Sequence, residues 1–330
     1  MKKLLLVFLA LCLSVLVACA SNENEGEIEA DATEETFGDE DSDYKIGVVL
    51  MSLNSDYWKT HMAGSKKAAE DLGIQVEVLG PTEETLYEDQ VKMVEDLISS
   101  GVDGLVVAPS LPEAMLPALE KAEAAGIPVA LADANVNEFD SRITFIGTEN
   151  YDAASQGGDF ISDQLDDGDK VLIVRGQMGA KVHDERTEGF QDALKDKNIE
   201  FIVQDAQSDR VKAVNIVENT LTVDPDIKAV FATSDEMALG SYTGLKNEGS
   251  TDIPLIGFDG TPDGLDAVLD GKMIANIAQD PYNMGYLGVE SVLKAINDEN
   301  VEERIDSGAE VYTEDNVEAR IKEVEGYLSN

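Results

Sequence analysis

Two carboxylates in this chain of 330 residues stand at the same place in two similar segments. Asp133 ends the apolar segment that begins at Ile127-Pro128, and Asp259 ends the segment that begins at Ile253-Pro254. Each segment predicts a buried parallel strand with Asp at its carboxyl end, where open α/β sheets bind ligands. We therefore predict two half-sites that face each other across one cleft. The alternative is that each Asp only caps the following helix.

The pattern around these residues predicts two similar lobes. Short β-rich runs alternate with longer helical patterns, which is the signature of a parallel sheet covered by helices. Strands are expected near 45–51, 75–80, 104–108, 128–133 and 143–148, and again near 170–175, 200–205, 229–234, 254–259 and 274–279. Helices are expected near 56–72, 84–99, 113–125, 150–166, 183–197, 209–222, 235–248, 281–297 and 315–328. The second half of the chain thus repeats the first.

The N-terminus has the pattern of a bacterial lipoprotein leader. Lys2 and Lys3 precede an apolar run that is too short to span a membrane. The run ends in Leu16-Val17-Ala18-Cys19, which resembles a lipobox. We expect residues 1–18 to be a signal peptide and Cys19 to be lipidated, which would anchor the protein to the outer face of the cell membrane.

The segment after Cys19 is strongly acidic. Residues 20–43 hold eleven Asp and Glu and neither Lys nor Arg. We therefore predict that residues 19–43 comprise the lipidated Cys19 and an acidic, disordered linker. The whole chain carries a net charge of −43, which excludes nucleic acid as a partner.

Three motifs resemble the ribose-binding protein group of periplasmic sugar-binding proteins, the substrate receptors of ABC importers. They are Phe231–Gly240 (FATSDEMALG), Gly257–Gly264 (GFDGTPDG) and Ile277–Gln279 (IAQ). The resemblance implies a type I periplasmic binding protein, with two doubly wound α/β lobes joined by a three-strand hinge. The lobes would comprise residues 44–147 with 281–308 and residues 148–280 with 309–330. Their crossings are expected near 147–149, 279–281 and 308–311.

The resemblance also implies a site for a neutral sugar or polyol. Carboxylates accept hydrogen bonds from adjacent sugar hydroxyls, a guanidinium donates to them, and an aromatic plane covers the C–H face of the ring. We expect ligand binding by Ser55, Tyr57, Trp58, Asp133, Arg186, Ser208, Ser234, Asp259 and Gln279. For some of these residues a structural role stays open instead. Tyr57 and Trp58 could form the core-facing side of a helix, Arg186 could make an ordinary ion pair, and Asp259 could cap a helix.

Five departures from the ribose-binding pattern all introduce smaller residues. The pattern has Asn, Asn, Arg, Phe and Asn where this chain has Ser55, Ala108, Ala134, Ser208 and Ser234. The pocket should therefore be roomier and poorer in donors than a ribose site, with Trp58 partly filling the space at Ser208. Ribose is then doubtful as the ligand, and a hexose, inositol, modified sugar or nucleoside-sized molecule stays open.

Other functions have less support in the sequence. A sensory receptor for a membrane kinase or chemoreceptor would use the same fold, and the sequence does not separate it from a transport receptor. Asp133 and Asp259 would suit a glycosidase as acid and base, but we do not expect an enzyme because no nucleophile with its base is visible. His61 and His183 lack a second His or Cys at ligand spacing, so neither a metal nor a cofactor is expected. We expect a monomer whose partner is an ABC permease.

Overall fold

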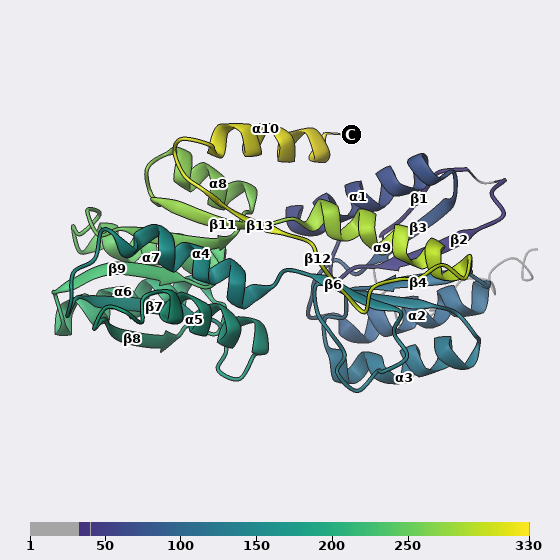
Figure 1. The fold of residues 1–330 in the computed structure, drawn as a ribbon, viewed down its shortest axis with the longest axis horizontal. Coiled ribbons are helices and arrows are strands. Elements are labelled where there is room, and N and C mark those ends of the chain that lie inside the picture. Colours follow the sequence, from purple (N-terminus) through teal and green to yellow (C-terminus); the bar gives the residue numbers. More distant parts are fainter. Residues whose placement is uncertain (1–32, 40, 330) are drawn as a thin grey trace, which may run out of the picture. The chain divides into compact units, whose positions relative to one another are not determined.

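The computed structural model describes residues 33–39 and 41–329, so the predicted leader and lipidated Cys19 lie outside the described residues. Within the described ranges, no helix is both long and apolar enough to span a bilayer. The chain forms two sheets with helices on both faces (Figure 1).

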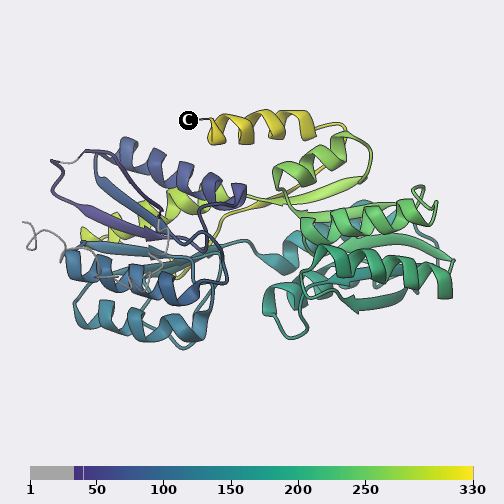
Figure 2. The same cartoon turned by 180° about the vertical axis from the view of Figure 1, so that it is seen from behind.

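The first sheet has strand order β1-β3-β2-β4-β5-β6-β12. Its strands are β1 (Thr33–Phe37), β2 (Lys45–Val49), β3 (Gln75–Gly80), β4 (Gly104–Val107), β5 (Val129–Ala132), β6 (Thr144–Gly147) and β12 (Arg304–Asp306). Its pairings are parallel except that of β1 with β3. On one face pack α1 (Asp56–Leu72) and α9 (Pro281–Ile296), and on the other α2 (Tyr87–Ser100) and α3 (Pro112–Ala124) (Figures 1 and 2).

The second sheet has strand order β13-β11-β10-β9-β7-β8. Its strands are β7 (Lys170–Arg175), β8 (Glu200–Asp205), β9 (Ile227–Ala232), β10 (Leu255–Asp259), β11 (Ala275–Gln279) and β13 (Ala309–Tyr312). One face packs on α4 (Asn150–Ser162) and α5 (Lys181–Ala193). The other packs on α6 (Arg210–Val223), α7 (Asp235–Asn247), α8 (Pro262–Leu269) and α10 (Val317–Leu328).

The hydrophobic core follows the alternation of side chains along buried strands. In β2, Ile46 and Val48 face α1 and α9, whereas Val49 faces α2 and α3. In β7, Val171 and Ile173 likewise face α4 and α5. Because both faces are covered, these strands are nearly continuous apolar runs, which is why their positions could be predicted. The predicted fold class of two doubly wound α/β lobes is confirmed.

Three connections carry the chain between the sheets. They lie between Gly147 and Asn150, between Gln279 and Pro281, and between Asp306 and Ala309. Apart from the edge strand β1, β5 and β10 are each the fourth strand of their half of the chain, so their carboxyl ends occupy equivalent positions in the two sheets. This equivalence sets the positions of Asp133 and Asp259.

The prediction of a disordered linker over 19–43 is wrong for β1. Its residues pair antiparallel with the edge strand β3, with Phe37 opposite Val76. The Phe37 side chain packs against the core cluster beneath α1, and the Lys66 ammonium lies 5.7 Å from its ring centroid. Pairing at a free sheet edge supplies backbone hydrogen bonds that composition alone does not reveal. The acidic residues therefore did not prevent strand formation.

Candidate functional site

All nine predicted ligand-binding residues line one cavity of about 420 Å³: Ser55, Tyr57, Trp58, Asp133, Arg186, Ser208, Ser234, Asp259 and Gln279. They come from both sheets and their helices. A volume of this size is typical of small-molecule sites. That these residues hold a ligand stays a prediction.

Asp133 is held by an aromatic hydroxyl at the end of β5. The Tyr57 hydroxyl donates to Asp133 Oδ1 at 2.7 Å, and the Asp133 backbone N–H donates to the carbonyl of Ile146 at 2.9 Å. Burial raises the pKa of the Asp133 carboxyl, and burial together with Asp133 raises the pKa of Tyr57 well above 10.0. Tyr57 therefore stays a neutral donor. Among the described residues no group binds Asp133 Oδ2, which is available to a ligand.

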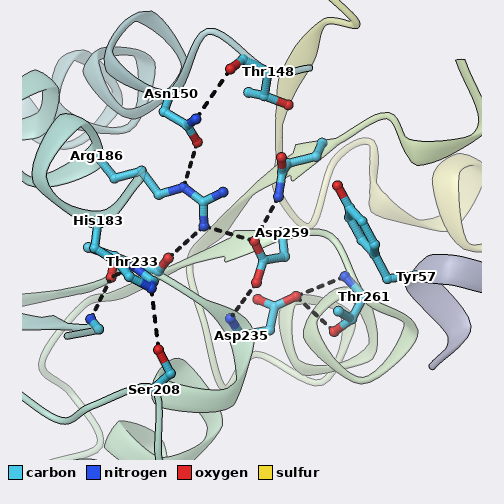
Figure 3. Close-up of polar contacts among 12 residues, drawn as sticks. Tyr57, Thr148, Asn150, His183, Arg186, Ser208, Thr233, Asp235, Asp259 and Thr261 are labelled. Carbon is cyan, nitrogen blue, oxygen red and sulfur yellow. Dashed lines mark hydrogen bonds and ion pairs between the residues drawn. The ribbon is translucent and has the colours of Figure 1, made fainter. Parts of the chain in front are cut away.

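Asp259 is held by a guanidinium and an amide (Figure 3). Its Oδ1 accepts from Arg186 at 3.0 Å and from Gln279 at 2.8 Å. Within the described residues its Oδ2 accepts only a long bond of 3.4 Å, from the backbone N–H of Asp235. Burial raises the pKa of the Asp259 carboxyl, although Arg186 opposes the shift. Like Asp133, Asp259 thus has one oxygen fixed by the protein and one with spare capacity.

The structure shows the contacts on which the structural roles left open for Asp259 and Arg186 depend. Thr261, not Asp259, caps α8, because its side chain accepts from the Gly264 N–H at 3.2 Å. Arg186 is a buried anchor: it donates to the side chain of Asn150 at 2.8 Å and to the carbonyl of Thr233 at 2.9 Å, besides Asp259 (Figure 3). Its guanidinium also lies 3.8 Å from the ring centroid of Phe258.

The aromatic pair divides between core and cavity. Trp58 is only 3% exposed, packs in the core beneath α1, and donates from Nε1 to Glu84 Oε1 at 2.7 Å. Tyr57 lies edge-on to it, with ring centroids 5.0 Å apart. Ser208 Oγ lies 3.3 Å from His183 Nε2, a partner that the sequence did not predict. Tyr57 is thus the more available aromatic surface of the two.

Several cavity residues were missed by sequence reasoning: Glu84, Thr148, Asn150, His183 and Glu236. Asn150 binds Arg186, and His183 lies three residues before Arg186 on α5. The i, i+3 spacing on one helix face was the signal that could have found His183. Among the described residues the hydroxyls of Thr148 and Ser234 are buried without a hydrogen-bond partner, so both are available to a ligand.

Comparisons with known proteins match most of the folded part. The family model of the periplasmic binding protein domain matches residues 46–300. The ribose import binding protein of Escherichia coli is 36% identical over 258 residues, covering 78% of this chain and 86% of that protein. The ribose import binding protein of Bacillus subtilis is 32% identical over 315 residues, covering 95% of this chain and 100% of that protein. The crystal structure of an ABC transporter periplasmic solute-binding protein from Actinobacillus succinogenes with bound D-allose has a TM-score of 0.76, at 26% identity, covering 84% of this chain and 99% of that one.

Proposed function

Because this chain belongs to the periplasmic binding protein family, in its ribose-binding group, we propose that it is a lipid-anchored receptor that delivers a neutral sugar or sugar-like solute to an ABC permease. Sugar binding for ABC transport outside the cytoplasm is the function of its group, and the chain is a binding protein rather than an enzyme. The ligand class, the lipid anchor and the residues that bind are our proposal.

The observation that carries the proposal is the matched pair of carboxylates. Asp133 and Asp259 follow equivalent strands of two sheets, line the same cavity, and each keeps one oxygen free or nearly free. Such oxygens accept hydrogen bonds, and adjacent sugar hydroxyls supply them. A ligand held by both would join the two lobes.

The charges in the cavity favour a neutral ligand. Its lining contains Glu84, Asp133, Glu236 and Asp259 against one cation, Arg186. Arg186 already donates to three acceptors of the protein. A ligand carboxylate or phosphate would therefore meet these acidic side chains and one guanidinium whose charge is already paired with Asp259, whereas the Arg186 Nη2 group makes no bond within the described residues and stays available to a neutral hydroxyl. Neutral hydroxyl groups meet acceptors instead.

Three of the five small replacements lie where they enlarge the site. Ser55, Ser208 and Ser234 line the cavity, and Ala134 lines an adjoining one of about 960 Å³. Ala108 is fully buried in the core beneath α1. We infer that ribose binds weakly and that a larger neutral sugar, such as a hexose or an inositol, binds well.

Ligand identity is tested by native mass spectrometry of freshly purified protein, followed by a thermal melting screen. The probes are D-ribose, D-allose, D-glucose, myo-inositol and glycerol. A ligand at one hundred times its dissociation constant stabilises by about 2.7 kcal/mol, which raises the melting temperature measurably. A largest shift with D-ribose would refute the proposal on ligand size. Turnover of chromogenic glycosides, without any melting shift, would refute the receptor function.

The anchor is tested separately through Cys19. The native chain should partition into the detergent phase and incorporate labelled fatty acid, whereas Cys19→Ala should do neither. Cys12→Ala is the matched control, because Cys12 lies inside the expected leader and should not be lipidated. Equal partitioning of the native and Cys19→Ala chains would contradict lipid anchoring while leaving sugar binding untouched.

A further inference from the structure

His183 occupies a defined place in the cavity wall. It lies in the first turn of α5, with Nδ1 2.9 Å from Thr233 Oγ1 and Nε2 3.3 Å from Ser208 Oγ (Figure 3). The ring also lies directly over Gly176, where an added Cβ would come within 2.1 Å of Nε2. The imidazole is thus fixed by contacts on three sides.

The imidazole is neutral at physiological pH. Burial and the guanidinium groups of Arg186 and Arg175 together lower the pKa of His183 to about 3, against smaller opposing effects of Asp184 and Asp205. Its place at the N-terminus of α5 also disfavours a positive charge. One ring nitrogen therefore donates and the other accepts, and the neighbours decide which.

The hydrogen bonds of Thr233 select the tautomer. Its hydroxyl oxygen accepts from the backbone N–H of Gly176 at 3.2 Å, and within the described structure the only acceptor near its proton is His183 Nδ1. If Nδ1 carried the proton, the fully buried Thr233 hydroxyl would have no acceptor, which costs free energy. Nδ1 therefore accepts, and Nε2 donates to Ser208 Oγ.

We propose that His183 is a positioning residue for ligand recognition, which accepts from Thr233, donates to Ser208 and thereby directs the Ser208 hydroxyl proton into the cavity. No acceptor for that proton lies within the described part of the chain. The proposal rests on the proposed function only for the identity of the ligand.

The consequence concerns ligand chemistry. Asp133 and Asp259 only accept hydrogen bonds, so they select hydroxyl groups that donate. Ser208 in this arrangement donates, so it selects an oxygen that accepts, such as a ring oxygen or a hydroxyl used as acceptor. The other tautomer would turn Ser208 into an acceptor and reverse this preference.

The first test is long-range ¹H–¹⁵N NMR of the full labelled chain, without ligand. The chain has only two histidines, and the signals lost in His183→Gln belong to His183. We expect a protonated Nε2, an unprotonated Nδ1 and no titration down to about pH 5, far above its lowered pKa. A protonated Nδ1, or titration near 6.5, would overturn the proposal whatever the protein binds.

The second test is calorimetry with the strongest binder among D-ribose, D-allose, D-glucose and myo-inositol. Ser208→Ala and His183→Ala should each weaken binding roughly fivefold, and the double variant no more than either. Gly176→Ala should reproduce the loss by displacing the ring, and Ser99→Ala, on the surface of α2, is the control. Additive losses, or full affinity in His183→Ala, would contradict the positioning role. If no probe binds, the NMR result still decides the tautomer.

Discussion

Asp133 and Asp259 share a backbone feature as well as a position. Their φ angles are 61° and 117°, values that residues other than Gly rarely adopt. Such strain persists where the surrounding structure fixes it, and it is concentrated at binding sites. At both places the turn of the chain directs a carboxylate to the cavity at the end of the fourth strand. The two Asp residues therefore share a positive φ as well as a position in the sequence, although the two angles differ.

Removing either carboxylate should weaken ligand binding. Asp133→Asn and Asp259→Asn keep the shape of the side chain but replace a charged acceptor, and each should cost about 1.5–3 kcal/mol. Calorimetry with the best sugar from the melting screen measures the loss, with Asp96→Asn on the exposed face of α2 as control. Unchanged affinity in both variants would exclude the two carboxylates from the site.

Asp235 should make stability depend on pH. It is 2% exposed and accepts from Thr261 and Asn276, and burial together with Asp259 raises its pKa from 3.8 to about 7. The folded state then binds more protons than the unfolded state between these values, so stability falls as pH rises through this window. Measured by urea unfolding across this pH window, the free energy of unfolding should fall less steeply with rising pH for Asp235→Asn than for the native chain. Parallel pH profiles would mean that Asp235 is charged throughout.

Residue types predicted the residues that line the cavity better than they predicted the residues that hold them in place. The carboxylates were recognisable from their positions at strand ends, and Arg186 from the resemblance to the ribose-binding group. His183 was not, because its role depends on Thr233 and Ser208, which are distant in sequence and meet only in the folded lobe. Trp58 bonds to Glu84, a contact that spacing along the chain does not specify.

At the scale of elements, close helix contacts hold the site. A Cβ at Gly189 of α5 would lie 2.1 Å from the carbonyl oxygen of Tyr151 in α4, and one at Gly64 of α1 would lie 1.9 Å from that of Tyr282 in α9. These contacts seat the helix that carries Arg186 and the helix that carries Tyr57. Both crossings therefore require glycine.

Gly189→Ala should destabilise the protein and weaken sugar binding together. The added methyl group must separate α5 from α4, which costs about 1–3 kcal/mol of stability and shifts Arg186 and His183. Urea unfolding and calorimetry on the same samples measure both effects. Glu188→Ala, on the exposed face of the same helix, is the control. Full stability with normal affinity would show that the helices adjust without cost.

The elements that sequence reasoning missed are short or lie at an edge. β12 has three residues and α8 has eight, too few for a clear hydrophobic period. β1 is acidic and exists through pairing with β3, a tertiary contact. The longer strands and helices were found because burial on both sheet faces imposes runs and periods that are visible in the sequence.

At the scale of the whole molecule, the two sheets share one topology. Apart from the edge strand β1, five strands of each half, counted from β2 and from β7, take the order second, first, third, fourth, fifth: β3-β2-β4-β5-β6 and β8-β7-β9-β10-β11. Asp133 directly follows β5, and Asp259 is the last residue of β10. One further strand then pairs with the last strand of each set: β12 pairs with β6, and β13 pairs with β11. This shared topology explains why one pattern of residues identified both half-sites.

Ligand should draw the lobes together. Tyr57 and Asp133 belong to one lobe and Arg186 and Asp259 to the other, so the ligand contacts both sets only when the lobes close on it. An equilibrium shifts toward the state that binds more tightly. Small-angle scattering should therefore give a smaller radius of gyration with the best sugar of the screen than without it. Tyr57→Phe, which loses the bond to Asp133 but keeps the ring, should weaken both affinity and compaction. An unchanged radius at saturation would mean that the ligand is held within one lobe, and the argument from two half-sites would then fail even if the protein remains a sugar receptor.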